Sequence, residues 1–543
     1  MGNRKYIVYL PILLAITLAS GIIIGNSLKR NAQISTGGLA LNNNNKISTI
    51  LQLIEHGYVD SVNTDDIIEK TIPELFKNLD PHTTYIPAKV MKDEQERMQG
   101  NFSGIGVQFS IQDDTVRVIE VISGGPSSKV GLMAGDRIVS VNDSVIAGVN
   151  VDNNKVMSVL RGEKGSIVKV GILRAGFSDE FEFEITRGDI PIFSVDVAYA
   201  IDKETGYIKV SRFGEQTYRE FMEGIGKLDN LGIDKIIIDL RGNTGGYLTA
   251  VIRMADEFLE KDEMILYTQG LNQPKKTYNA TSRNTCTDKQ VFVLMDEYSA
   301  SASEIFAGAI QDNDRGFVIG RRSFGKGLVQ EQIPFSDGSA IRLTVARYYT
   351  PSGRSIQKSY TEGNDKYYED LMARVHNGEL LQSDSIHVND SLKFYTKSGR
   401  LVYGGGGITP DIFVPVDTTG YSTYFMKLVQ RGIIYQFAYA YADQHREVLS
   451  SFHTPDEIED YLDKENVLQE LIRYAGEKGI HYDKKDAKES EFIINTQTKA
   501  YIARNIIGDD GFYPIIRHID NTLLRAVEVT KENLLVENVG KRK

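Results

Sequence analysis

The sequence of 543 residues contains a single cysteine, Cys286, and only eight histidines. One cysteine excludes an intramolecular disulfide and a zinc site built from several cysteines. Cys286 stands in the polar segment RNTCTDKQ, without a helix start or a histidine nearby, so we do not expect it to be a nucleophile. No histidine lies between His82 and His376, and neither is set in a motif typical of a Ser-His-Asp triad. A Ser-His-Asp triad and a zinc site built from several cysteines therefore have little support.

Positive charge is also scarce. The chain has 62 basic and 73 acidic residues, a formal net charge of −11, and no basic stripe of the kind that nucleic-acid binding favours. The hydrophobic fraction of 41% and the charged fraction of 25% are those of an ordinary globular protein. A chain this long exceeds what one hydrophobic core usually supports, so we expect several domains.

One long uncharged segment is present, from Tyr6 to Leu28, directly after Arg4 and Lys5. It is long enough for a transmembrane helix and longer than the apolar part of a typical signal peptide. We therefore predict a signal-anchor helix over residues 1–30, although residues 18–20 also fit a cleavage site. The basic residues before the segment place the bulk of the chain outside the cytoplasm.

Residues 31–94 are predicted to be a polar spacer followed by a small helical region, because apolar residues recur at helical spacing from residue 46. From Gly104 onward the pattern changes to short alternating strands, and FSGIGVQF is followed by GGPSSKVGLMAGDRIVSVND. Residues 95–185 resemble a PDZ domain. In such a domain, backbone N–H groups of Gly104, Ile105, Gly106 and Val107 would hold a peptide's terminal carboxylate, and the adjoining strand edge would add the peptide as a further strand.

Residues 186–420 alternate unbroken apolar strands with amphipathic helices, which indicates an α/β core with a partly parallel sheet. Within this region residues 360–400 are charged and poor in large apolar residues, so we expect a loop or lid there. Residues 421–543 are predicted to be a helical C-terminal extension without a catalytic motif.

Three short motifs in the α/β region have chemical potential. SASASE begins a helix, where the helix dipole stabilises an alkoxide, although serines there also serve simply as N-caps. Lys326 stands between two glycines in SFGKGLVQ, and it becomes a base only if desolvation lowers its pKa. The glycine pair in IIIDLRGNTGG suits an oxyanion hole or a plain tight turn. GRRSFGKG also approaches a phosphate-binding loop, but Gly327 replaces the Ser or Thr that would bind magnesium.

These motifs in this order, after a PDZ-like segment and with LDPHTTYI, YYTPSGRSIQ and GITPDI, closely resemble the C-terminal processing peptidases, also called tail-specific proteases. The resemblance covers residues 46–417. It implies Ser301 as the nucleophile, Lys326 as the general base and Gln330 as the residue that positions Lys326. It also implies backbone N–H groups of Gly246 and Ala302 as the oxyanion hole, with Gly246 chosen over Gly245.

The resemblance further implies a Clp-protease/crotonase-like α/β core with an inserted PDZ domain, acting without a metal or cofactor. The expected function is a serine endopeptidase that cleaves proteins near free C-termini in the cell envelope, anchored in the inner membrane with its catalytic part on the periplasmic side. A homodimer or an adaptor complex through the C-terminal extension is an expected partner interaction. The alternatives are an inactive peptide-binding scaffold and, more remotely, a crotonase-type acyl-CoA enzyme.

Overall fold

The computed structural model describes residues 15, 17–21, 46–112, 114–122, 124–174, 177 and 179–532. The chain divides into two units, Met1–Leu75 and Phe76–Lys543. The predicted membrane segment at residues 1–30 lies outside the described residues, apart from 15 and 17–21. Among the residues that are described, no helix combines the length and the apolar character that crossing a membrane requires.

The first unit contains two helices, α2 (Lys46–Gly57) and α3 (Thr64–Phe76), of which the second ends one residue into the next unit. Both occur where the sequence shows helical spacing of apolar residues. Asp65 and Asp66 in the first turn of α3 favour helix formation there, because negative charge is stabilised near the helix N-terminus.

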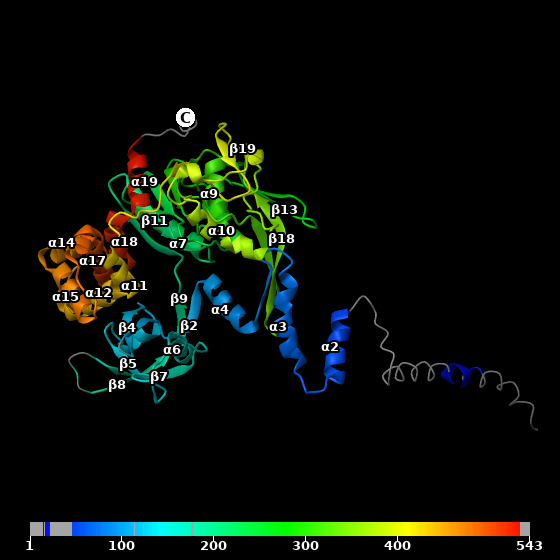
Figure 1. Cartoon of the computed structure of the whole chain (residues 1–543), viewed down its shortest axis with the longest axis horizontal. Helices are drawn as coiled ribbons and strands as arrows, with labels where there is room; N and C mark the ends of the chain where they lie inside the picture. The colour runs from blue at the N-terminus through cyan, green and yellow to red at the C-terminus, as the bar shows by residue number, and fades with distance from the viewer. Residues whose placement is uncertain are drawn as a thin grey trace, which may run out of the picture. The chain divides into compact units, whose positions relative to one another are not determined.

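A six-stranded sheet forms the core of the α/β region (Figure 1). Its strands, in spatial order, are β10 (Val195–Ala200), β11 (Thr205–Val210), β12 (Lys235–Asp239), β15 (Gln290–Met295), β16 (Gly316–Gly320) and β21 (Ile412–Phe413). All neighbouring pairs are parallel except β10 and β11. The central strands β12 and β15 are apolar between their end residues because both faces of the sheet are covered.

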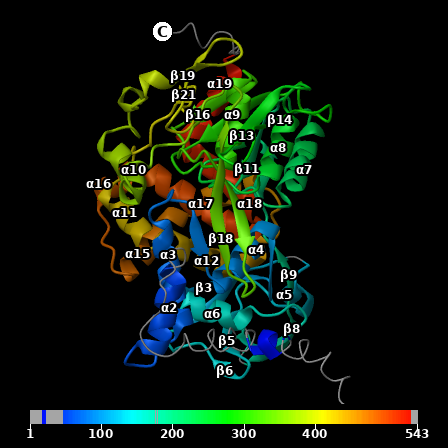
Figure 2. The same ribbon diagram turned by 90° about the vertical axis from the view of Figure 1, so that its right-hand side faces the viewer.

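The two faces of this sheet are covered by different parts of the chain. Helices α7 (Thr217–Asp229), α8 (Leu248–Asp256) and α9 (Ala302–Asp312) share one core with Ile236 and Ile238 of β12. Ile237, whose side chain points the other way, shares a second core with the C-terminal helix α19 (Asn521–Lys531). The predicted α/β architecture is confirmed, and part of the C-terminal extension lies against the back of its sheet (Figures 1 and 2).

A second, antiparallel sheet lies beside the first and supplies part of the site. It consists of β1 (Thr84–Ile86), β18 (Ala340–Tyr349), β13 (Met264–Gln269) and β14 (Lys276–Asn279) in that order, with β17 (Leu328–Pro334) paired to β18. Strand β1 comes from LDPHTTYI, so this early segment is held against β18 by its register with residues 340–342.

The PDZ region is inserted through a two-stranded stem, β2 (Asn101–Gly104) and β9 (Gly188–Pro191), after helix α4 (Ala88–Gln99). Its strands are β3 (Val107–Gln112), β4 (Thr115–Val121), β5 (Arg137–Val141), β6 (Ser144–Val145), β7 (Ile167–Leu173) and β8 (Phe181–Thr186). Two helices accompany them, α5 (Pro126–Val130) and α6 (Asn153–Leu160). Alternate residues of the strands form a separate buried core, as the period of two predicts.

Residues 360–400, expected to be a loop or lid, contain a well-formed helix, α10 (Asn364–His376), with Tyr367 and Arg374 buried. Short elements follow it: η2 (Ser383–Ser385), η3 (Asp390–Leu392), β19 (Lys393–Tyr395) and β20 (Leu401–Tyr403). The expectation of a segment without core residues is wrong, because Arg374 donates hydrogen bonds to the backbone carbonyls of Arg322, Ser323 and Phe324 and thereby fixes the helix in place.

The C-terminal extension is helical, as predicted. Its remaining helices are α11 (Thr423–Gln430), α12 (Ile433–Gln444), α13 (Arg446–Leu449), α14 (Pro455–Lys464), α15 (Val467–Glu477), α16 (Lys484–Glu489), α17 (Glu491–Ile507), α18 (Asp509–Ile516) and η4 (Arg517–Ile519). Helices α11 to α18 share a hydrophobic core of their own.

Candidate active site

The nucleophile candidate occupies a strained turn between β15 and α9. Ser301 has φ 55° and ψ −112°, in the left-handed half of conformational space that a residue with a side chain rarely adopts. Its backbone N–H donates to Glu304 Oε2 at 2.8 Å, and its carbonyl accepts from the N–H of Glu304 at 2.9 Å. These bonds hold a sharp strand-to-helix turn, the geometry that presents a nucleophilic side chain at the edge of a sheet.

The two flanking serines have different surroundings. Ser299 and Ser303 are fully buried, and their hydroxyls donate to the carbonyls of Leu240 at 2.9 Å and Asn243 at 2.8 Å. Both therefore fasten the turn to the loop that follows β12. Ser301, the middle serine, keeps partial exposure. This difference favours Ser301 as the residue that a substrate reaches.

Lys326 lies in the loop between β16 and β17 and is largely buried. Burial, reinforced by the positive charge of Arg342, lowers its pKa to about 8, against the opposing charges of Glu304 and Asp80. Its ammonium nitrogen donates to Gln330 Oε1 at 3.0 Å. Among the described residues, no hydrogen bond joins Lys326 Nζ to the Ser301 hydroxyl. A lysine with this pKa is partly neutral near pH 8, as a general base requires.

Two buried groups connect the turn of Ser301 with the loop of Lys326. The Tyr348 hydroxyl lies 3.1 Å from the carbonyl oxygen of Ser301 and 2.7 Å from that of Lys326. Glu304 Oε2 accepts from the N–H groups of both Ser301 and Lys326, each at 2.8 Å. The main chains of the two predicted catalytic residues are thereby brought together.

Glu304 is the most heavily bonded of the groups that the sequence reasoning missed. Its other carboxylate oxygen accepts from the N–H of Gly325 at 2.8 Å and from the hydroxyl of Ser323 at 2.5 Å. Burial raises its pKa to about 7, although all four donors oppose this shift. The signal available in the sequence was a serine followed three residues later by glutamate, the pattern of a capping box.

Gln330 is itself held in place from the other side. Its amide nitrogen donates to the carbonyl of His82 at 2.6 Å. The turn that presents this carbonyl is closed by Asp80 Oδ1, which accepts from the N–H groups of His82 and Thr83, each at 3.0 Å. The His82 ring lies 2.7 Å from the hydroxyl of Tyr367, and burial followed by the charge of Lys326 lowers its pKa to about 4. A neutral His82 adds no charge beside the base.

The glycine pair lies directly against the nucleophile turn. A Cβ on Gly245 would come within 2.8 Å of Cβ of Ser301 and 3.0 Å of the nitrogen of Ala302. Gly245 N–H already donates to Asn243 Oδ1 at 2.9 Å. In the described part of the chain, neither Gly246 N–H nor Ala302 N–H has an acceptor. This difference favours Gly246 over Gly245 as the partner of Ala302 in an oxyanion hole, which remains a prediction.

The predicted peptide-binding segment leads into the edge strand of the PDZ sheet. Gly106, with φ 77°, leads into β3, which pairs on one side with β4 and ends the sheet on the other. The carbonyl oxygen of Ile105 accepts from the N–H of Ser127 at 2.9 Å, and that of Gly106 accepts from the N–H of Ile122 at 3.0 Å. These two hydrogen bonds fix the turn through its carbonyl oxygens. Over the described residues, the N–H groups of Ile105 and Gly106 have no partner, as an anion-binding turn requires.

Two alternatives from the sequence lose support. Cys286 is fully buried in the main core, and burial raises the pKa of its thiol to about 11, which disfavours the reactive thiolate. The segment GRRSFGKG runs from β16 into strand β17 rather than into a helix, so it lacks the helix N-terminus of a phosphate-binding loop.

Comparison with protein families identifies the class of this fold and site. Residues 204–365 match the model of Peptidase family S41, and residues 103–185 match that of the PDZ domain. Residues 424–508 match a family of unknown function. The α/β region and the PDZ insertion therefore define a serine-type peptidase.

Individual relatives agree with this classification. The chain is 33% identical to a carboxy-terminal-processing protease of Bartonella bacilliformis over 356 residues, which cover 63% of this chain and 80% of the relative. It is 34% identical to the carboxy-terminal processing protease CtpB of Bacillus subtilis over 58% of this chain and 66% of that protein. It is 31% identical to the carboxy-terminal processing protease CtpA of the same organism over 66% of this chain and 76% of that protein. The chain belongs to the carboxy-terminal processing protease family.

Proposed function

We propose that this protein is an endopeptidase that cleaves proteins near their C-termini, with Ser301 as nucleophile and Lys326 as general base. The observation that carries the proposal is a buried lysine whose pKa is lowered to about 8, joined through Tyr348 and Glu304 to a strained serine at a helix N-terminus. This is the combination that turns a weak hydroxyl into a nucleophile.

In the reaction, neutral Lys326 takes the proton of the Ser301 hydroxyl, and the oxygen attacks the carbonyl carbon of the scissile peptide bond. The negative charge that develops on the carbonyl oxygen is stabilised by the N–H groups of Gly246 and Ala302. The protonated lysine then gives its proton to the leaving amine. Water, activated by the same lysine, hydrolyses the acyl-enzyme and restores the free hydroxyl.

Gln330 and His82 position the base. Since Gln330 accepts from Lys326 Nζ and donates to the His82 carbonyl, its amide cannot rotate without breaking one of the two bonds. Among the described residues, no carboxylate is hydrogen-bonded to Lys326 Nζ, and the charges of Glu304 and Asp80 do not outweigh the effect of burial on its pKa.

The PDZ region supplies the substrate preference in this proposal. A free C-terminal carboxylate binds the N–H groups of the segment Gly104–Val107, and the preceding residues extend the sheet along β3. The N-terminal segment 1–30 anchors the enzyme in the inner membrane, with the peptidase on the periplasmic side. Support for this location comes from the uncharged run after Arg4 and Lys5.

The test is cleavage of an unstructured protein with an apolar C-terminus by the full chain in detergent, followed by mass spectrometry. The parent should cleave, and Ser301→Ala and Lys326→Ala should not. Ser451→Ala, at an exposed serine of the C-terminal extension, is the matched control and should retain activity. Binding of the peptide without cleavage by any variant would instead support the inactive scaffold.

A further inference from the structure

The C-terminal extension reaches the loop that carries Gly246 through one ion pair. Asp520, the N-cap residue of α19, accepts two hydrogen bonds from the guanidinium of Arg241, at 2.8 and 2.6 Å. Arg241 stands two residues after the end of β12 and begins the loop that ends at Gly246. A paired, two-bond contact between arginine and carboxylate fixes both position and orientation.

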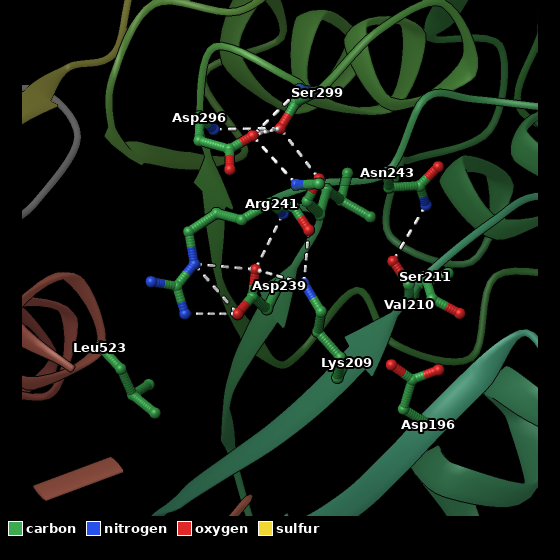
Figure 3. A network of polar contacts seen from close by, with 12 residues as sticks. Asp196, Lys209, Val210, Ser211, Asp239, Arg241, Asn243, Asp296, Ser299 and Leu523 are labelled. Carbon is green, nitrogen blue, oxygen red and sulfur yellow. Dashed lines mark hydrogen bonds and ion pairs between the residues drawn. The ribbon is translucent and has the colours of Figure 1, made fainter. Parts of the chain in front are cut away.

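Arg241 belongs to a cluster of four charged side chains at the end of the sheet. Asp239, only 1% exposed, accepts from Arg241 Nε at 3.0 Å and from Lys209 Nζ at 3.2 Å (Figure 3). Two cations therefore surround one buried anion, and Asp520 supplies the second negative charge. A cavity of about 280 Å³ lies among these residues.

The loop after Arg241 depends on such anchors because its backbone is unusual. Gly242, Gly245 and Gly246 have φ of 71°, 104° and 149°. Gly242 N–H donates to Asp296 Oδ1 at 2.9 Å, which also accepts from Ser299 N–H at 3.0 Å (Figure 3). Glycine permits these conformations but does not select them, since it adopts many others at little cost. Selection must come from contacts at both ends of the loop.

We propose that Asp520 is a positioning residue for the oxyanion hole: through Arg241 it holds the loop 241–246 in the conformation that aims Gly246 N–H at the substrate. The proposal rests on the proposed function and extends it, because it gives the C-terminal extension a part in the chemical step. Without Asp520, Arg241 keeps only Asp239, the cluster carries an excess positive charge, and the loop gains alternative conformations. The expected loss is in the reaction rate rather than in substrate affinity.

Asp520→Asn is the first variant to test, because asparagine remains a good N-cap while the ion pair is lost. Arg241→Lys is the second, since it keeps the charge but not the two-bond geometry. Thr530→Val is the matched control: it removes another contact of the extension with the sheet, the 3.4 Å hydrogen bond between the hydroxyls of Thr530 and Thr205. Thr205 begins β11, at the end of the strand opposite to Lys209. Thermal melting of each variant verifies that it is folded.

Two readouts then separate positioning from general destabilisation. The first is the ratio of kcat for a peptide ester to kcat for its thionoester, in which sulfur, a weak acceptor, replaces the carbonyl oxygen. This ratio does not depend on the fraction of active enzyme. The second is hydrogen exchange of peptides that contain residues 240–247 in the full chain without substrate.

For Asp520→Asn and Arg241→Lys we expect the ester rate and the ester-to-thionoester ratio to fall about tenfold, less than the loss of an entire oxyanion donor. KM should change little, and exchange at 240–247 should rise, with Thr530→Val unchanged in both readouts. An unchanged ratio in Asp520→Asn overturns the proposal, whether or not exchange rises. If the parent hydrolyses neither ester, the proposed function fails, and exchange alone decides whether Asp520 orders the loop.

Discussion

The pH dependence of the reaction follows from the surroundings of Lys326. With a pKa of about 8, about 9% of the lysine is neutral at pH 7 and about 91% at pH 9. The value of kcat/KM should therefore rise about tenfold over this interval and level off above it. The rate rises with pH because, in the proposed mechanism, only the neutral amine of Lys326 accepts the serine proton.

Removing Arg342 tests the cause of this low pKa. After burial, the positive charge of Arg342 makes the largest contribution to the lowered pKa of Lys326, because it disfavours a second cation nearby. Arg342 is itself paired with Glu94. In Arg342→Gln the pKa of Lys326 should rise, and the pH profile should move to higher pH. Because Arg342 is one-third exposed, we expect a shift of about half a unit, which lowers the rate at pH 7 about threefold.

The assay is the rate of cleavage of a short peptide, measured at limiting substrate from pH 6 to 10. Arg347→Gln is the matched control, because Arg347 lies on the same strand, bonds to Tyr360 and is not among the charges that act on Lys326. Its profile should coincide with that of the parent. A profile of Arg342→Gln that stays in place or moves to lower pH would refute the assignment of Lys326 as a base with a lowered pKa.

Three further predictions concern the buried groups of the site. Lys326→Met should stabilise the fold by about 3 kcal/mol at pH 7, because folding lowers the pKa of Lys326 from 10.5 to about 8 and this lowers stability at pH values below 8. The parent recovers this stability as the pH rises from 8 to 10.5. Urea unfolding of both proteins at pH 7 and pH 10 checks this, and equal stability of parent and variant at pH 7 would contradict it. Gly246→Ala should lower kcat about 100-fold and destabilise the protein, because its Cβ would lie 2.1 Å from the Phe213 carbonyl oxygen. Kinetics and thermal melting measure the two effects. Gly226→Ala is the control, because a Cβ at Gly226 would meet no atom within 4 Å. Tyr348→Phe should reduce kcat about tenfold at constant KM, since the hydroxyl that bridges Ser301 and Lys326 is lost, and an unchanged kcat would show that the bridge is dispensable.

Some of the site could be predicted because its signals are local. A glycine pair after an apolar strand, a serine at a helix start and a lysine between glycines are readable within a few residues, since turns and helix ends have strict backbone requirements. The family pattern then selected Ser301 among three serines. The partial exposure of Ser301 and the buried hydrogen bonds of Ser299 and Ser303 provide a physical reason for the same choice.

The supporting groups could not be found in this way. Tyr348 follows Lys326 by 22 residues and Ser301 by 47, and His82 lies 248 residues before Gln330. Their hydrogen bonds depend on the register of β1 and β17 on β18, which no local pattern specifies. The expectation of a coreless segment at 360–400 failed for the same reason, because the carbonyls that Arg374 binds lie about 50 residues earlier.

The sequence by itself determined the class of the protein, the order of the PDZ and peptidase regions and the three motifs proposed to form the active site, because hydrophobic period and turn residues act over short distances. Only the tertiary structure decided which glycine N–H lacks an acceptor among the described residues, which carboxylate joins the serine and lysine loops, and where the C-terminal extension lies. These depend on long-range packing, in which α19 covers the back of the sheet and brings Asp520 within 2.8 Å of Arg241, 279 residues away.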